Sequence, residues 1–379
     1  MNYLKEFEVN LAYHFSEVLE QPLVQPRWVY ISLSHNCTYN CRMCMVVKTL
    51  KGYELSKEVL ERAFEQIALW PRNRTVVITG GEPFLRKDIF EIINSSVIKG
   101  IETEAVSNGA LINEELAFKI ISSGLGNIAI SLDGAKEDTH DFIREKGSFK
   151  KAVKAIKNLV EVKQKIKSGP QISVWTTIMK ENMDELSDII YLVRDLGVEC
   201  LVYHPVIVAQ ADMQNTSSSA PFWIKEEGLK FLEKQIDKII AYKRKNGLVA
   251  FLHNPYLWIK YFRGNLTKKD WKCNPFAFIN VGPDAEMRSC GASFGNIKEM
   301  DMKSCLNTEE AFKARKLMKS CPKPCLQTCW AHPESDSLPE IIDNFIDSVK
   351  NNKDKGEFLK QALKILERYE DKVKGYKDA

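Results

Sequence analysis

Three cysteines stand within eight residues near the start of the chain, at Cys37, Cys41 and Cys44. A loop with this CxxxCxxC spacing offers three thiolates to one metal centre, whereas a fully coordinated iron–sulfur cluster takes four cysteines. The spacing therefore predicts a cluster with one iron open to a reactant. Two alternatives are a structural zinc site completed by a distant residue and three buried thiols without a metal, although zinc sites more often pair one CxxC with another.

A second group of cysteines lies towards the C-terminal end, at Cys273, Cys290, Cys321, Cys325 and Cys329. The segment between the first two reads as a hairpin with a turn at residues 282–284. A structural zinc site is an alternative to a cluster here, because four cysteines can close a tetrahedron. Cys200 and Cys305 stand among apolar residues, where a free cysteine commonly packs as a small hydrophobic side chain.

A Gly-Gly-Glu-Pro run at residues 80–83 follows the apolar segment 75–79. Two glycines let a backbone approach a ligand closely, and the Glu82 carboxylate can accept hydrogen bonds from an amine. The alternative is a tight connection between a strand and a helix. The run follows the three-cysteine loop by one βα unit, and this position indicates a binding site.

The composition is that of an ordinary globular protein, with 44% hydrophobic and 27% charged residues among 379. The formal charge of +4 is the small difference between 54 basic and 50 acidic residues, so nucleic acid is not an expected partner. The N-terminus lacks a secretory signal, and no apolar run reaches the roughly 18 residues of a spanning helix. We expect a cytoplasmic protein, where clustered cysteines serve as metal ligands.

Short apolar strands alternate with helical patterns from Trp28 to Pro205. Six strands are predicted, at residues 28–34, 75–79, 102–107, 127–131, 171–178 and 199–204. Ser56, Asn113 and Asn182 are expected to begin the helices 57–69, 114–123 and 183–196. Such alternation predicts an α/β fold with a parallel sheet, a partial (βα)6 version of the TIM barrel, in which the chemistry lies on the loops after the strands.

The expected organisation has five parts. A helical lead-in spans residues 1–27, the partial barrel 28–205, a linker with helices 206–272, a small cysteine-rich domain 273–335, and C-terminal helices that cover the barrel 336–379.

The ordered motifs CxxxCxxC, Gly80–Pro83, Ser107-Asn108-Gly109 and Ser131-Leu132-Asp133-Gly134 make residues 28–205 resemble the radical S-adenosylmethionine (SAM) superfamily. The resemblance implies that the three cysteines hold a [4Fe–4S] cluster whose open iron binds SAM. In this reading Glu82 and the glycine backbone hold the ammonium of SAM, Ser131 its ribose, and Arg144 its carboxylate. The implied cofactor-binding residues are Gly80, Gly81, Glu82, Pro83, Asn108, Ser131, Asp133 and Arg144.

The C-terminal cysteines resemble the SPASM or shorter twitch extension of that superfamily, which carries auxiliary clusters. A full SPASM domain has seven cysteines, and its usual glycine five residues before the second cysteine is Ala285 here. We therefore expect one auxiliary [4Fe–4S] cluster, held by Cys273, Cys290 and two of Cys321, Cys325 and Cys329.

The implied reaction is reductive cleavage of SAM to a 5′-deoxyadenosyl radical, which takes a hydrogen atom from the substrate. A flavodoxin or ferredoxin would supply the electron. His204 and Tyr203, at the end of the sixth strand, are the candidate catalytic residues, since strand residues can face the barrel interior. Sulfatase-maturing relatives carry an acid after the second auxiliary cysteine, where this chain has Gly291.

The substrate is expected to be a small molecule or a peptide. About 27 residues precede the first strand, too few for a fused leader-peptide recogniser, and this favours a small molecule. One alternative is a ribosomal-peptide maturase that uses a separate recognition protein. A non-catalytic iron–sulfur protein is the alternative of another class.

Overall fold

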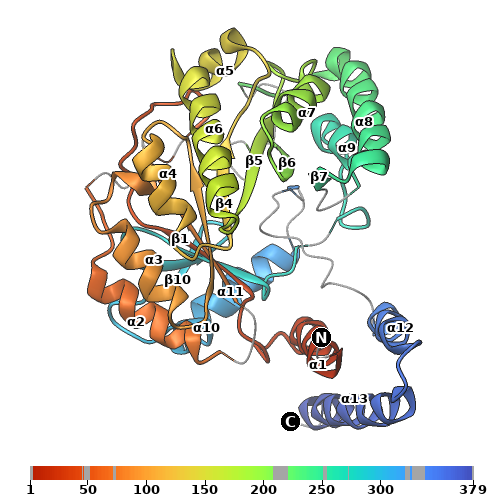
Figure 1. The fold of residues 1–379 in the computed structure, drawn as a ribbon. Coiled ribbons are helices and arrows are strands. Elements are labelled where there is room, and N and C mark those ends of the chain that lie inside the picture. Colours follow the sequence, from red (N-terminus) through yellow and green to blue (C-terminus); the bar gives the residue numbers. More distant parts are fainter. Residues whose placement is uncertain are drawn as a thin grey trace.

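The protein is described by a computed structural model covering residues 3–44, 46, 52–70, 74–207, 221–250, 254–271, 273–320, 325–326 and 338–377. A curved sheet carries helices along its outer face, and α12 and α13 lie to one side beside α1 (Figure 1). Cys321 and Cys329 fall outside the described residues. Among the described residues no helix is long and apolar enough to cross a membrane.

The strands form one ten-stranded sheet in the order β10-β9-β8-β1-β2-β3-β4-β5-β6-β7. Strands β1 to β7 pair in parallel, which confirms the predicted α/β partial barrel. The predicted strand positions agree with the structure to within two residues. The strands are β1 (Trp28–Ser32), β2 (Thr75–Thr79), β3 (Glu102–Ser107), β4 (Asn127–Ser131), β5 (Gln171–Ile178), β6 (Cys200–Pro205), β7 (Val249–Ala250), β8 (Phe278–Val281), β9 (Glu286–Ser289) and β10 (Ala292–Asn296).

Two of the three predicted helix starts are confirmed. Ser56 and Asn113 each accept a hydrogen bond from a backbone N–H in the first turn of the helix that follows. The prediction for Asn182 is wrong, because its amide donates to the carbonyls of Asp133 and Thr177 instead, and that helix begins at Leu186. The helices are α1 (Tyr3–Leu19), α2 (Lys57–Ala68), the 3₁₀ helix η2 (Pro83–Leu85), α3 (Ile89–Val97), α4 (Glu114–Ile121), α5 (Glu137–Ile143), α6 (Ser148–Ile166), α7 (Leu186–Asp195), α8 (Glu226–Asn246), α9 (Leu257–Arg263), α10 (Met302–Leu306), α11 (Glu309–Ser320), α12 (Leu338–Val349) and α13 (Lys355–Lys377).

The two faces of the barrel strands differ in exposure. On β3 the outward Thr103 is buried and its hydroxyl lies 2.7 Å from that of Ser96 in α3, whereas the inward Glu104 is partly exposed. On β6 the outward Leu201 is fully buried, and the inward Val202 is partly exposed. The helices therefore fill the outer face, while side chains leave part of the interior accessible.

The C-terminal cysteine-rich region belongs to the same sheet, because β8 pairs in parallel with β1. The predicted hairpin is confirmed, since β8 and β9 are antiparallel and flank residues 282–285. Ala285 has φ +69° and is fully buried, so the backbone at this position keeps the left-handed conformation that suits the glycine of the resembled family. The departure from the family pattern is a change of side chain at an unchanged backbone.

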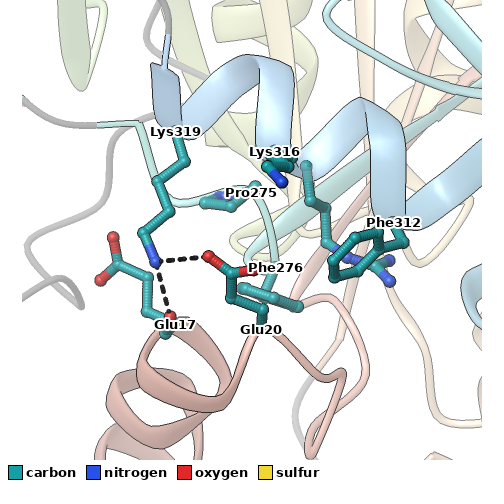
Figure 2. A pocket seen from close by; sticks show the side chains of 8 residues that line it. Glu17, Glu20, Pro275, Phe276, Phe312, Lys316 and Lys319 are labelled. Atoms are coloured by element: carbon teal, nitrogen blue, oxygen red, sulfur yellow. Dashed lines mark hydrogen bonds and ion pairs between the residues drawn. The ribbon is translucent and has the colours of Figure 1, made fainter.

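The prediction that the C-terminal helices cover the barrel is wrong. The apolar stripes of α12 and α13 pack against α1, where Phe7 and Phe345 have ring centroids 4.5 Å apart. Lys319 connects α11 to the end of α1. It pairs with Glu20 at 3.0 Å and donates to the Glu17 carbonyl at 3.2 Å. The small pocket beside this contact is lined by no predicted site residue (Figure 2).

The turn between β9 and β10 places Cys290 and Gly291 at φ +49° and +80°, both left-handed, as a two-residue hairpin turn requires. We predict that Gly291→Val lowers the free energy of unfolding by about 1–2 kcal/mol, because a β-branched residue is strained there. Gly291→Asn should lower it less, since asparagine tolerates this conformation. Urea denaturation of both variants measures the difference, and equal losses would contradict the assigned turn.

Candidate functional site

The cysteine loop after β1 rests on the two glycines after β2. The backbone N–H groups of Gly81 and Glu82 donate to the carbonyls of Ser34 and Asn36, each at 2.8 Å. A Cβ atom on Gly81 would lie 1.9 Å from the Asn36 oxygen, so only glycine allows this approach. The glycines therefore position the segment that leads into Cys37. Their carbonyls accept no hydrogen bond from the described residues.

The Glu82 side chain, only 1% exposed, lies inside the protein. Its carboxylate accepts hydrogen bonds from the Ser107 hydroxyl at 2.9 Å, the Asn108 N–H at 2.9 Å and the Phe84 N–H at 3.2 Å. Burial raises the pKa of Glu82 to about 7, against the effect of these donors. That Glu82 holds the ammonium of SAM stays a prediction, and the oxygen that accepts from the Asn108 N–H has room for a further donor. The neighbouring Pro83 is buried and begins η2.

Asn108 connects the end of β3 to the cysteine loop. Its side-chain N–H₂ group donates to the Thr38 hydroxyl at 3.0 Å and lies 3.5 Å from the Cys37 sulfur. Its amide oxygen accepts from the Ala110 N–H at 2.9 Å. The sequence suggested a contact with SAM, whereas the structure directs this amide towards a predicted cluster ligand. Thr38 was missed, since a threonine between two cysteines carries no distinctive signal.

Arg144 and Asp133 form a buried ion pair opposite the glycines. The Arg144 Nε donates to one Asp133 oxygen at 2.6 Å, and the other oxygen accepts from the Thr177 N–H at 2.8 Å. Burial opposes the charge of Arg144, but Asp133 and the thiols of Cys41 and Cys44 outweigh it and raise the pKa of Arg144. The two terminal NH₂ groups of Arg144 have no partner among the described residues and could bind a carboxylate. Asp133 serves as the anchor of that guanidinium.

The far side of the cysteine loop is attached to the corner between α5 and α6. The N–H of Asn40 donates to the Glu145 carboxylate at 3.1 Å, and the N–H of Arg42 donates to the Ile143 carbonyl at 3.0 Å. The Arg42 guanidinium also lies 4.0 Å from the centre of the Phe142 ring. Sequence reasoning missed these contacts, because 100 or so residues separate the partners.

The three thiols are free cysteines in a partly desolvated environment. Burial raises the pKa of Cys37 and that of Cys41, the latter to about 11, so metal binding must displace their protons. Within the described ranges no three His, Cys, Asp or Glu side chains are grouped to hold one metal ion.

Ser131 and His204 both face the barrel interior. The Ser131 hydroxyl has no partner among the described residues, and His204 Nε2 lies 3.1 Å from the Thr177 hydroxyl. The His204 Nδ1 is buried without a partner. Burial lowers the pKa of His204 to about 4, so the imidazole is neutral at pH 7, and a pKa this low is poorly matched to acid–base catalysis near neutrality.

Tyr203 does not face the interior. Its hydroxyl donates to the Leu186 carbonyl at 2.5 Å, and its ring contacts that of Trp258 on the outer face of the sheet. The prediction of a catalytic Tyr203 is wrong, because successive strand residues point to opposite faces and His204 takes the inner one.

The C-terminal cysteines are only partly within the described residues. Cys273, Cys290 and Trp28 pack against a small cluster formed by Phe278 and Met318. Cys325 lies against the main core near Tyr261. Cys305 is fully buried, as predicted for a packed thiol, and burial raises its pKa to about 11.

Residues 31–193 match the family model described as the radical SAM superfamily. This segment forms a radical SAM domain. It contains the cysteine loop, the glycines, Asn108 and the Arg144–Asp133 pair, all of which meet at the carboxyl ends of the strands. A radical SAM domain implies a [4Fe–4S] cluster and SAM as cofactors.

The chain is similar in sequence to several curated proteins. It is 29% identical over 182 residues to an AdoMet-dependent heme synthase of Methanosarcina barkeri, covering 47% of this chain and 50% of that protein. It is 30% identical over 186 residues to the mycofactocin maturase MftC of Mycolicibacterium smegmatis, covering 48% and 45%. The matched region spans about half the length of these relatives. They are enzymes by name, and this protein is an enzyme with a radical SAM domain.

Solved structures share the fold at low sequence identity. The structure described as native anSMEcpe with bound AdoMet has a TM-score of 0.61 at 16% identity and covers 89% of this chain and 99% of that one. Streptococcus suis SuiB bound to S-adenosylmethionine has a TM-score of 0.60 at 14% identity and covers 77% and 68%. The likeness extends beyond the radical SAM domain.

We predict that Gly81→Ala prevents the cysteine loop from taking its position, because the new Cβ would collide with the Asn36 carbonyl. The purified variant should hold about four fewer irons per chain than the wild type after anaerobic reconstitution. Gly356→Ala is the control, since a Cβ there meets nothing within 4 Å. Full iron content in Gly81→Ala would show that the close contact is not needed.

We predict that Asn108→Ala lowers the reduction potential of the cluster held by Cys37, because N–H donors to cluster sulfurs favour the reduced state. Potentiometry followed by electron paramagnetic resonance measures the change. Asn307→Ala, whose amide donates to a carbonyl in α10, is the control. An unchanged potential in Asn108→Ala would mean that its amide only supports Thr38.

Proposed function

We propose that this protein cleaves SAM reductively and uses the radical to abstract hydrogen from a small-molecule or peptide substrate. The observation that carries the proposal is the convergence of the glycine motif and the Ser107–Gly109 motif on the cysteine loop. Glu82 joins the glycine turn to Ser107 and Asn108, and Asn108 reaches Cys37. The arrangement places three thiols beside donors and acceptors suited to an amino acid group.

The residues that would bind SAM differ in part from those expected. The ammonium would meet the carbonyls of Gly80 and Gly81 and the Glu82 carboxylate, one oxygen of which accepts only from the Asn108 N–H. The carboxylate would meet the free NH₂ groups of Arg144, which Asp133 holds in place. Ser131 is free to donate to a ribose. When bound, the cluster and SAM supply the electron transfer and radical formation, and these residues orient the reactants and exclude water.

An auxiliary [4Fe–4S] cluster is proposed for Cys273 and Cys290 with two of the last three cysteines. Both described ligands pack on the cluster against which Trp28, at the start of β1, also packs, whereas Cys37 follows the end of β1. The two ends of β1 are about 13 Å apart at the usual rise of a strand. The auxiliary cluster would assist electron transfer or bind substrate, and a flavodoxin or ferredoxin would reduce the first cluster.

A ribosomal-peptide maturase is the second candidate. It is favoured by the sequence similarity to MftC, which is named a maturase, while the similarity to heme synthases favours a metabolite. In this case a separate protein would recognise the peptide.

Anaerobic reconstitution, reduction with dithionite and addition of SAM should yield 5′-deoxyadenosine in the wild type. The triple variant Cys37→Ala, Cys41→Ala, Cys44→Ala should yield none. Chromatography with mass detection measures the product. A wild type that holds its cluster and yet forms no 5′-deoxyadenosine, even with candidate substrates, would refute the proposed activity in favour of a non-catalytic iron–sulfur protein.

The same triple variant tests the auxiliary cluster. It should retain about four irons and four sulfides per chain if one auxiliary [4Fe–4S] cluster is present. If the variant instead retains about one zinc and no iron, the C-terminal cysteines hold a structural zinc ion and not an auxiliary cluster.

A further inference from the structure

An acidic site lies inside the barrel, below the SAM motifs. Glu104 of β3 is paired in register with Val77 on one side and Asn127 on the other. Its carboxylate faces inward, since the adjacent Thr103 bonds to Ser96 in the outer helix α3. Asn127 donates to this carboxylate at 3.5 Å. The two side chains therefore share one place on the inner face of the sheet.

The charge of Glu104 has no counterpart in the described part of the chain. It forms no ion pair with a Lys, Arg or His of the described residues, and the like charge of Glu102 acts on it. Desolvation and this like charge both raise the pKa of Glu104. A partly buried carboxylate without a cation is costly to ionise, so a bound cation would stabilise it.

Asn127 provides an independent indication of a ligand. The residue is 8% exposed, and its buried amide oxygen has no hydrogen-bond partner among the residues that the structure describes. The orientation of the amide follows from its neighbour, because the N–H₂ end must face the Glu104 carboxylate. The unpaired atom is therefore an acceptor. An acceptor beside a carboxylate suits a ligand that carries several N–H donors.

The wall between this site and the SAM motifs is largely apolar. Val106 and Ala129 stand side by side above Glu104, and Trp175 and Val202 are paired on β5 and β6. Ser131 lies four residues after Asn127 on β4, about 13 Å higher at the usual rise of a strand. A ligand that reaches from Glu104 and Asn127 to the level of Ser131 needs an apolar stem.

We infer that Glu104 and Asn127 bind the protonated amine or guanidine of a substrate whose apolar stem extends towards the SAM site. Cys200 of β6 lies close enough for the charge of Glu104 to act on it. Strand β6 therefore bounds the site on that side. The inference rests on the proposed function, since the reacting carbon must lie near the SAM motifs. It narrows the substrate to small amines or to peptides that present a lysine or arginine side chain.

The test uses the anaerobically reconstituted full chain with SAM, titrated in a calorimeter with n-pentylammonium chloride and with 1-pentanol. The wild type should bind the ammonium more tightly than the alcohol. Glu104→Gln should weaken the ammonium about tenfold or more and leave the alcohol unchanged, since a charged hydrogen bond is worth that much. Glu161→Gln, a matched change on the exposed face of α6, should alter neither.

Equal affinity for the two probes, no binding of the ammonium, or the same loss in Glu161→Gln would overturn the inference. Asn127→Leu is a second variant that keeps the carboxylate, and it should weaken the ammonium less than Glu104→Gln does. Thermal unfolding of each variant separates lost binding from lost folding. The 5′-deoxyadenosine assay on the same preparation is independent of the probe: product without ammonium binding refutes only this inference, and binding without product refutes only the proposed function.

Discussion

The buried carboxylate of Glu82 is the interaction on which the site depends. It takes donors from Ser107, Asn108 and Phe84, so it holds the turn after β2 against the end of β3. Because a buried carboxylate is stable only with its donors in place, the two strand ends cannot shift independently. The backbone beside Glu82 then supports the cysteine loop, and the Asn108 side chain reaches Cys37. A single acid therefore transmits the geometry of the sheet to the cysteines.

The sheet gives this arrangement both rigidity and space. The helices bury the outward residues of the strands, while the inward residues stay partly accessible because the barrel is incomplete. The pairing of β8 with β1 continues the sheet on the side of the C-terminal cysteines. Cys273 and Cys290 thus lie near the start of β1 and the cysteine loop follows its end. One strand fixes the separation between the two cysteine groups.

Electrostatics divides the interior into two regions. Near the carboxyl ends of the strands, Arg144 is neutralised by Asp133 and keeps free donors, and the neutral His204 adds a hydrogen-bonding group without charge. Deeper in the barrel, Glu104 has no cation among the described residues and Asn127 has an unpaired acceptor. The first region suits a carboxylate and the second an amine. The contrast gives the interior a polarity that a substrate must match.

Local patterns in the sequence determined the parallel strands, the caps at Ser56 and Asn113, the hairpin after Cys273 and the motif positions. These features depend on alternation, capping and spacing over a few residues, which are legible along the chain. Only the tertiary structure decided which atoms are already used. The Glu82 carboxylate, the Asn182 amide and the Tyr203 hydroxyl all find partners from other elements, and the α12–α13 pair packs on α1 from the opposite end of the chain. Residue type shows that a group can bind, but burial and the partners brought by folding decide whether it remains free.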